Sequence, residues 1–287
     1  GDRNRSHWST SKTPSYTKSV SWQHHLYLLP YRAYCAWSDV LMRIIYIIIF
    51  SLTIFIPVCN AMKIYPPEDF FHGTQLTLAQ SIYQGDLASV KQRAGVTDLN
   101  KPGRQDMTIL FYALHCAQGE KKQQLAIMSE LVRQGADPLQ NVPDMGSVAG
   151  VTASSSSPEY MEALLDGGMS PNAAVQKSPI FYYSASDNTL NTLSLMIQRG
   201  ANINQSDNLG RTVLMEALDG MQLDTVVWLL KHGADPHAVE TNSGWSFARQ
   251  LAYVVKRNNG QEGPTLDKLN EIIALIKQAG VSWPPAQ

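Results

Sequence analysis

The chain has 287 residues, of which 44% are hydrophobic and 16% are charged. This composition is that of a chain with an ordered core, and it excludes an intrinsically disordered protein. The 23 basic and 24 acidic side chains give a net charge of −1, but residues 1–61 hold six basic and two acidic groups, which leaves a net charge of −5 on residues 62–287. Because an acidic body repels phosphates, nucleic acid is not expected as a partner.

Residues 1–41 are rich in Ser, His, Trp and Tyr and show no clear period. Their two neighbouring histidines have no metal-ligand spacing. The sequence that follows opens as Met42-Arg43, a normal start for a signal peptide. Residues 1–41 are therefore interpreted as an upstream or disordered extension, with Met42 as the expected start of the protein.

Residues 44–56 form an apolar run that follows a basic residue and precedes Cys59-Asn60-Ala61. As a helix the run spans about 20 Å, at about 1.5 Å per residue, which is shorter than the hydrocarbon core of about 30 Å. This pattern predicts a signal peptide over residues 42–61, cleaved after Ala61, and hence a periplasmic protein. A retained membrane anchor and a buried core helix are the alternatives.

Cys59 raises a second possibility for this region, namely a lipid anchor. A bacterial lipobox resembles Leu-(Ala/Ser)-(Gly/Ala)-Cys, and here Pro57 and Val58 fit it badly. The chain has three cysteines and no C-x-x-C pair, so a zinc or thioredoxin-like site has no support. After cleavage Cys116 would be the only cysteine, and no internal disulfide could form.

One sequence pattern recurs four times in the remaining chain: two apolar residues, two polar residues, a Gly and a short turn. Its glycines, Gly135, Gly168, Gly200 and Gly233, are 33, 32 and 33 residues apart. At each, we expect an apolar pair to end a helix, the Gly to close it in the left-handed conformation, and the next residues to start an extended turn. Units this small cannot bury their own apolar faces, so the spacing predicts stacked units that share one core.

Residues 207–235 resemble an ankyrin repeat, whose pattern runs roughly D-x-x-G-x-T-P-L-H-x-A, a helix ending in apolar residues, then G-A-D. The matching residues are Asp207, Gly210, Thr212, Leu214, Ala217, Asp224, Val226, Val227, Leu229, Leu230, Gly233, Ala234 and Asp235. Val213 replaces the usual Pro and Met215 the usual His. In the family the Thr caps the first helix and bonds to that His, so the resemblance implies a weaker local bond here.

The resemblance covers about residues 70–284, although the other units match it in register rather than residue by residue. The unit that starts at Thr108 reaches its Gly six residues later than the unit that starts at Thr212, and we expect the extra residues in a helix-to-helix loop near 118–123. A second insertion is expected at 257–264 in the last unit. The predicted fold is an all-α ankyrin-repeat solenoid over residues 62–287, with five to six stacked helix-turn-helix units and β-turn or hairpin fingers.

No catalytic motif, cofactor site or metal site is expected. G-x-S-x-G, H-E-x-x-H and phosphate-loop patterns do not occur in the sequence. His115 and Cys116 are adjacent on an expected helix, so their side chains diverge by about 100°, and a nucleophile pair is the less favoured interpretation. Glu159 and Glu162 are three residues apart with nothing to suggest a cleft around them.

The resemblance implies that a partner protein binds to the turn tips and to the first helix of each unit. These helices are expected to begin near Ile109, Val148, Pro179, Val213 and Phe247. Tyr, Trp and Arg anchor interfaces most often, and the acidic body suggests a partner with a basic face. The predicted partner-binding residues are Arg104, Gln105, Tyr112, Met145, Lys177, Tyr182, Asn208, Glu216, Asn242, Trp245 and Arg249.

Small exported ankyrin proteins of this kind resemble the immunity proteins of type VI secretion toxins, notably of lipase toxins. The resemblance implies a periplasmic protein that binds and neutralises a cognate toxin. It rests on architecture and not on a motif. The alternatives are a periplasmic scaffold or assembly partner of an endogenous envelope enzyme, an ankyrin effector directed into a host cell, and a catalyst.

Overall fold

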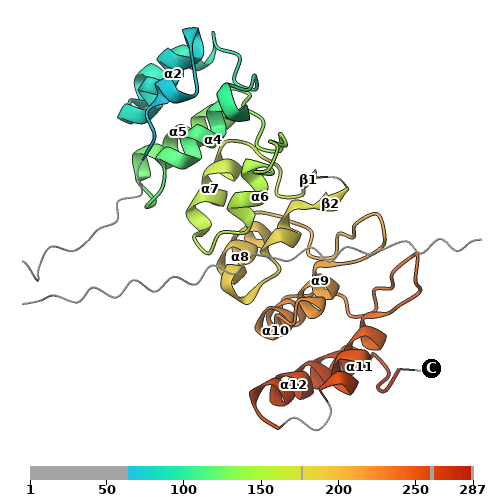
Figure 1. Cartoon of the computed structure of the whole chain (residues 1–287). Helices are drawn as coiled ribbons and strands as arrows, with labels where there is room; N and C mark the ends of the chain where they lie inside the picture. The colour runs from blue at the N-terminus through green and yellow to red at the C-terminus, as the bar shows by residue number, and fades with distance from the viewer. Residues whose placement is uncertain (1–63, 176, 259–261, 286–287) are drawn as a thin grey trace, which may run out of the picture. The chain divides into compact units, whose positions relative to one another are not determined.

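The computed structural model describes residues 64–175, 177–258 and 262–285, which belong to one compact unit (Figure 1). The predicted extension 1–41, the predicted signal peptide 42–61 and the lipid anchor at Cys59 lie outside the described residues. Among the residues that are described, none of the helices combines the length and the apolar character needed to cross a membrane.

The described residues form six helix pairs that follow one another along the chain (Figure 1). The first members, here called the inner helices, are α2 (Gly73–Gln84), α4 (Ile109–Cys116), α6 (Val148–Ala153), the 3-10 helix η3 (Ile180–Ser184), α9 (Val213–Asp219) and α11 (Phe247–Arg257). The second members, the outer helices, are α3 (Leu87–Ala94), α5 (Lys122–Arg133), α7 (Pro158–Asp166), α8 (Leu190–Gln198), α10 (Leu223–Lys231) and α12 (Pro264–Gln278).

The two kinds of helix form two layers. Each inner helix packs against the next inner helix, from α2 through α4, α6, η3 and α9 to α11. The outer helices α3, α5, α7 and α8 contact one another in the same order, as do α10 and α12. This arrangement confirms the predicted solenoid, and it contains six units. Three short 3-10 helices are also present: η1 (Pro67–Asp69) precedes the first pair, η2 (Arg104–Asp106) lies between the first two pairs, and η4 (Asp187–Thr189) lies between the two members of the fourth pair.

The segments that join an outer helix to the next inner helix are here called the fingers; they comprise residues 98–107, 137–146, 170–178, 203–211 and 236–245. One finger holds a two-stranded antiparallel hairpin of β1 (Ala174–Val175) and β2 (Ser178–Pro179), with Val175 opposite Ser178. Three other fingers close with single antiparallel bridges, such as Ser206 with Thr212. The predicted hairpin fingers are thus present.

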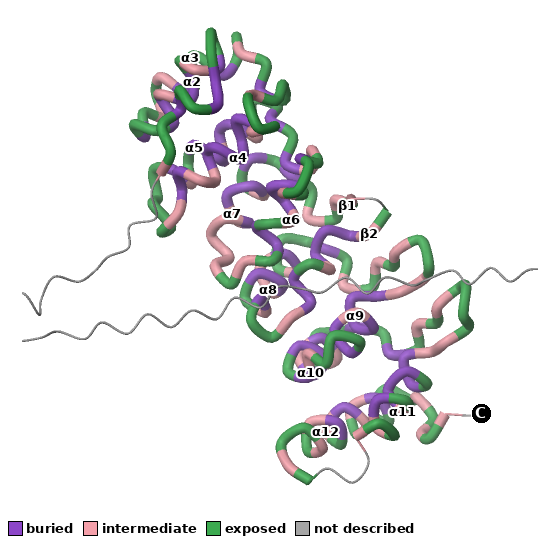
Figure 2. Tube along the Cα trace, in the orientation of Figure 1, coloured by how far each residue is buried: buried purple, intermediate pink, exposed green. Residues whose placement is uncertain are grey.

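One continuous apolar core runs through all the pairs (Figure 2). Each unit contributes fully buried side chains to it, including Leu78, Ile109, Leu164, Phe181 and Phe247. A single pair has too little apolar surface to enclose its own core, so each unit depends on its neighbours for burial. Figure 2 shows burial along the helices and mainly exposed or half-buried residues in the fingers.

The predicted glycine turns close the outer helices. Gly135, Gly168, Gly200 and Gly233 have φ angles of 101°, 107°, 100° and 93°, a region that side chains rarely adopt. After each one, the next backbone N–H donates to a carbonyl in the last helical turn, as Ala234 does to Leu229 at 3.0 Å. The apolar-polar-Gly pattern therefore ends the outer helix in every unit where it occurs.

An asparagine in three of the fingers ties each of these fingers to the glycine turn of the following unit. Asn204 donates from Nδ2 to the carbonyl of Gly233 at 3.2 Å, and its Oδ1 accepts from the N–H of Asp235 at 2.8 Å. Asn100 and Asn172 make the same pair of bonds in their own units. These asparagine clamps were not predicted, because both bonds link residues about 30 positions apart.

The extra six residues of the second unit are shared among three places. Compared with the fifth unit, α4 is longer than α9 by one residue, the following loop is longer by two, and α5 is longer than α10 by three. The prediction that they all lie in the loop near 118–123 was therefore wrong. In the added turn of α5, the buried side chain of Gln124 donates from Nε2 to the carbonyl of Ile82 at 2.9 Å.

Candidate partner-binding surface

The finger residues predicted to bind a partner are at the exposed tips. Arg104, Gln105, Lys177, Asn208 and Asn242 are all exposed. Gln105 and Lys177 have positive φ angles of 55° and 71°, so the local turn geometry fixes these two tips. The structure therefore places these five side chains where a partner can reach them, and their binding role remains a prediction.

Tyr112 was expected on the exposed face of the second inner helix, and this expectation was wrong. The side chain is fully buried, with 0% exposure. Its ring packs against Phe70 and Phe71, and its hydroxyl donates to the backbone carbonyl of Tyr65 at 2.9 Å. Residues 65–71 cover this helix, so Tyr112 is a core residue rather than a contact for a partner.

Tyr182 is half-buried, and its hydroxyl is bonded to the next finger. Its hydroxyl lies 2.9 Å from the carbonyl oxygen of Gln205 and 2.5 Å from that of Arg211, and it donates to either one. Burial raises the pKa of this phenol, so the hydroxyl remains a donor. The neighbouring Tyr183, by contrast, is 49% exposed.

Glu216 is held by Arg211, which is the centre of a cluster of charged side chains. The guanidinium of Arg211 forms a close ion pair with Glu216 and lies 3.6 Å from Asp219 and 3.9 Å from Glu240. The cluster joins the finger 203–211 to α9 and to the following finger. The Glu216 carboxylate is thus already paired, which the sequence did not indicate.

Three hollows lie along the inner helices, and each is lined both by finger residues and by residues at the far ends of these helices. A groove of about 740 Å³ is bordered by Arg104, Gln105, Met145 and nine other residues, which include Tyr65, Gln118 and Val151. A second hollow of about 520 Å³ shares Met145 and Val151 with it and extends to Tyr183. The two are therefore continuous along α4, α6 and η3.

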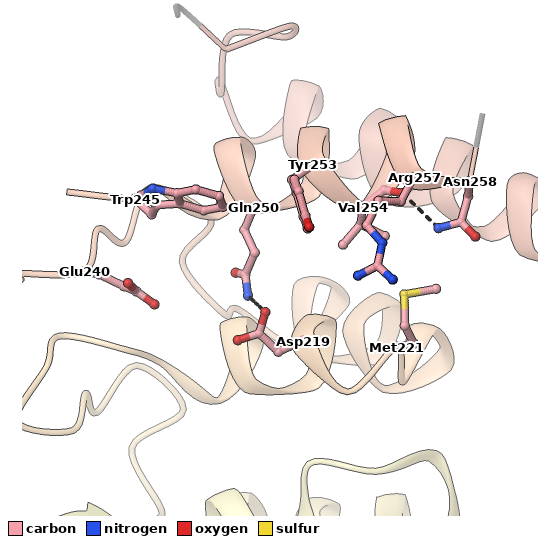
Figure 3. A pocket seen from close by; sticks show the side chains of 9 residues that line it. All are labelled: Asp219, Met221, Glu240, Trp245, Gln250, Tyr253, Val254, Arg257 and Asn258. Carbon is pink, nitrogen blue, oxygen red and sulfur yellow. Dashed lines mark hydrogen bonds between the residues drawn. The ribbon is translucent and has the colours of Figure 1, made fainter. Parts of the chain in front are cut away.

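A third hollow of about 480 Å³ lies between α9 and α11 (Figure 3). Its lining residues are Asp219, Met221, Glu240, Trp245, Gln250, Tyr253, Val254, Arg257 and Asn258. The structure thus brings Arg104, Gln105 and Met145 together in one groove and places Trp245 in another. Lys177, Asn208 and Asn242 line none of these hollows.

Five of the nine large exposed apolar side chains of the described residues lie at these hollows. Tyr65, Val151, Tyr183, Met221 and Tyr253 are each between 41% and 51% exposed, and each lines at least one of the three. Exposed apolar groups concentrated on one face mark interaction surfaces in soluble proteins. Sequence reasoning missed Tyr65, Val151, Met221 and Tyr253. Val151 and Tyr253 stand on helices, where a position at a hollow looks like any other core position in the sequence, and Met221 lies in the loop between α9 and α10.

The side chains of Cys116 and Glu162, which the sequence offered as candidates for chemistry, have surroundings that suit a structural role. Cys116 is buried, and burial raises the pKa of its thiol to about 11, so at neutral pH it is not a thiolate. Glu162 lies on an outer helix, where its carboxylate accepts from Arg199 at 2.8 Å. Within the described part of the chain, no cluster of His, Cys, Asp and Glu could hold a metal ion.

One family model matches the central part of the chain. Residues 150–240 match the family model for ankyrin repeats in three copies. A comparison with curated proteins finds no match to this sequence.

Several solved structures are similar to the chain. The ankyrin repeat protein EF0377 is 18% identical, with a TM-score of 0.51 over 72% of this chain and 99% of that one. An ankyrin repeat domain (ABAYE2397) from Acinetobacter baumannii AYE is 20% identical, with a TM-score of 0.49 over 71% and 97%. The ankyrin repeat domain of Bcl-3, a member of the IkappaB protein family, is 21% identical, with a TM-score of 0.49 over 70% and 97%. The likeness to EF0377 shows the fold alone. This chain contains ankyrin repeats, and its described residues have the ankyrin-repeat fold.

Proposed function

We propose that this chain binds another protein along its inner helices and fingers. The observation that carries the proposal is the coincidence of the three hollows with the exposed apolar side chains on one face. Ankyrin repeats themselves indicate a protein–protein interaction module. A preformed surface of stacked units pays little conformational entropy on binding, which favours a rigid partner contact over a folding-coupled one.

We propose further that the partner is a secreted toxin of the lipase type and that binding neutralises it in the periplasm. The support is the predicted signal peptide over residues 42–61 and the resemblance to exported ankyrin immunity proteins. Such a protein would cover the active site of the toxin and protect the cell that makes it. A scaffold or assembly partner of an envelope enzyme, and a host-directed ankyrin effector, are the competing proposals.

The test is a pulldown from the native cell envelope with the full chain carrying a C-terminal tag, followed by mass spectrometry. One toxin or lipase retained in a one-to-one ratio would support the immunity proposal. Several housekeeping envelope proteins would favour the scaffold proposal. If the chain retains no protein from either the envelope or a host-cell extract, protein binding itself is contradicted.

Point variants make the pulldown specific to the proposed face. Val151→Ser and Tyr183→Ala each alter an exposed side chain at the continuous hollows, and we expect both to reduce retention of the partner. Tyr83→Ala is the matched control, because Tyr83 is 47% exposed but lines none of the hollows. Equal retention by all three variants would place the interface elsewhere.

A further inference from the structure

We propose that α11 docks an acidic segment of the partner protein, with Arg249 and Arg257 each binding one carboxylate of that segment. Trp245 and Tyr253 hold the two guanidinium groups in place for this contact. The inference rests on the proposed protein-binding function and specifies the chemistry of the partner at this end of the solenoid.

The four side chains form a row along one face. Arg249, Tyr253 and Arg257 are four residues apart on α11, so they share a face, and Trp245 stands just before the helix. The guanidinium carbon of Arg249 lies 5.2 Å from the centroid of the Trp245 ring, and that of Arg257 lies 5.7 Å from the centroid of the Tyr253 ring. The two rings meet edge to face at 6.0 Å.

An arginine that stacks on an aromatic ring is held in an orientation in which it can bind a carboxylate. A ring contacts the flat face of the guanidinium and leaves its N–H edges open, and these edges bind carboxylates in a bidentate manner. Figure 3 shows the Tyr253 and Arg257 side chains reaching from α11 into the hollow, above Met221. The groups are therefore held in position before a partner arrives, which lowers the entropy cost of binding.

The charges around α11 select an acidic occupant. The helix has no acidic residue, and its cations Arg249, Lys256 and Arg257 are all exposed. Across the described residues none of these three takes part in an ion pair. In contrast, Arg133, Arg199 and Arg211 are each paired with carboxylates of the chain itself.

An acidic protein segment fits this site better than a nucleic acid. Asp219 and Glu240 line the same hollow, and residues 62–287 carry a net charge of −5. A phosphate backbone has a charge at every step and would meet these carboxylates, whereas a protein segment can place its charges only where the arginines are. For this end of the molecule the proposal replaces the expectation of a basic partner face.

The spacing of the arginines predicts the pattern of the segment. Arg249 and Arg257 are eight residues apart on the helix, which corresponds to about 12 Å at about 1.5 Å per residue. An extended chain rises about 3.3 Å per residue, so carboxylates four residues apart span a similar distance on the same face. The residue midway between them faces the hollow, where Met221, Tyr253 and Val254 provide apolar contacts. The expected motif is acidic-x-apolar-x-acidic in an extended conformation.

The test uses the full chain and two labelled peptides, Ser-Glu-Thr-Leu-Thr-Glu-Ser and its counterpart with Gln in place of both Glu. Binding is measured by titration with chemical-shift mapping at low ionic strength. We expect the Glu peptide to bind and to shift the signals of α11, and the Gln peptide to bind at least about tenfold more weakly, since charge-assisted hydrogen bonds are lost.

Three variants separate recognition from general charge. Arg249→Gln and Arg257→Gln should each lower the affinity for the Glu peptide by about tenfold or more. Lys256→Gln, on the same helix, should change this affinity less than either arginine variant does. Since all three side chains are exposed, the thermal midpoint should not move. The proposal is overturned if the two peptides bind alike or not at all. It is also overturned if the Lys256 variant loses as much affinity for the Glu peptide as the arginine variants do, or if a single-stranded oligonucleotide binds α11 more tightly than the Glu peptide does.

The same arginine variants in the envelope pulldown keep the two proposals apart. If they retain the partner as well as the wild type does, protein binding stands and docking at α11 is overturned. If the wild type retains nothing, the proposed function fails, and the peptide titration still decides whether α11 recognises paired carboxylates.

Discussion

Thr108 and Thr212 stand at the same position in two units, directly before an inner helix, yet their hydroxyls are in opposite situations. Thr108 accepts a hydrogen bond from the N–H of Phe111 at 3.2 Å and so caps its helix. Thr212 is buried to the same degree, at 4% exposure, but its Oγ1 has no hydrogen-bond partner among the described residues. Neither unit has the family's His at this place, because Phe111 and Met215 stand three residues after the two threonines, so the cap bond alone distinguishes the two hydroxyls. Replacing each Thr by the isosteric Val should therefore have effects of opposite sign.

The expected magnitudes follow from these contacts. A buried hydroxyl without a partner costs about 1–3 kcal/mol, so Thr212→Val should raise the free energy of unfolding by about 1 kcal/mol. Thr108→Val leaves the Phe111 N–H buried without its acceptor and should lower the free energy of unfolding by about 1–2 kcal/mol.

Urea unfolding followed by circular dichroism measures both effects against the wild type. The difference between the two variants is more robust than either value, because changes to the unfolded chain are alike in both. If Thr212→Val destabilises the protein as much as Thr108→Val, the Thr212 hydroxyl is paired in solution and the reasoning from its missing hydrogen bond is wrong.

Three more outcomes are expected. Asn204→Ala removes both bonds of one asparagine clamp and should lower the urea midpoint by the equivalent of about 1–2 kcal/mol; an unchanged midpoint would show that water replaces them. The hydrogen bond from the Gln134 amide holds the pKa of Glu130 below its ordinary value of 4.5, so the stability from this group is present above pH 4.5 and is lost as the pH falls through the lowered value. Glu130→Gln should therefore flatten the acid side of the stability curve, and an unchanged slope would contradict this. Burial lowers the pKa of His115 below 6.5, and its neutral Nε2 accepts from the N–H of Tyr65 at 3.2 Å. Acidification through and below that lowered pKa should hence move the Tyr65 amide signal in NMR spectra, and His115→Gln should abolish the shift.

Local signals in the sequence predicted the frame of the fold. A helix stop at Gly135 or Gly233 needs only a glycine after an apolar pair, and the start of a helix at Val148 or Phe247 needs only a Ser before it. Both lie within a few residues of the feature that they determine. The repeat of such local signals at a constant interval was sufficient to predict stacking.

Contacts between units could not be predicted from such local signals. Tyr112 is buried because residues 65–71, about 45 positions earlier, cover its helix. Trp245 and Arg249 were predicted at the binding face, but Tyr253 and Arg257 were not. Their place became visible only when α11 proved to extend to Arg257, where the sequence had suggested the start of an insertion. Non-local contacts of this kind leave no periodic trace in a single sequence.

The second unit shows where extra residues can be inserted in such a solenoid. Inner helices start at the fingers and outer helices return to them, so the residue added to the end of α4, the two in the loop and the three at the start of α5 all lie at the edge opposite the fingers. Extension there leaves the interval between successive fingers unchanged. Exposed Gly119 in that loop is accordingly the place to attach a fluorophore or to splice in a short tag. A reporter at that site would leave the spacing of the recognition surface unchanged, and it would report on the end of the groove that Gln118 lines.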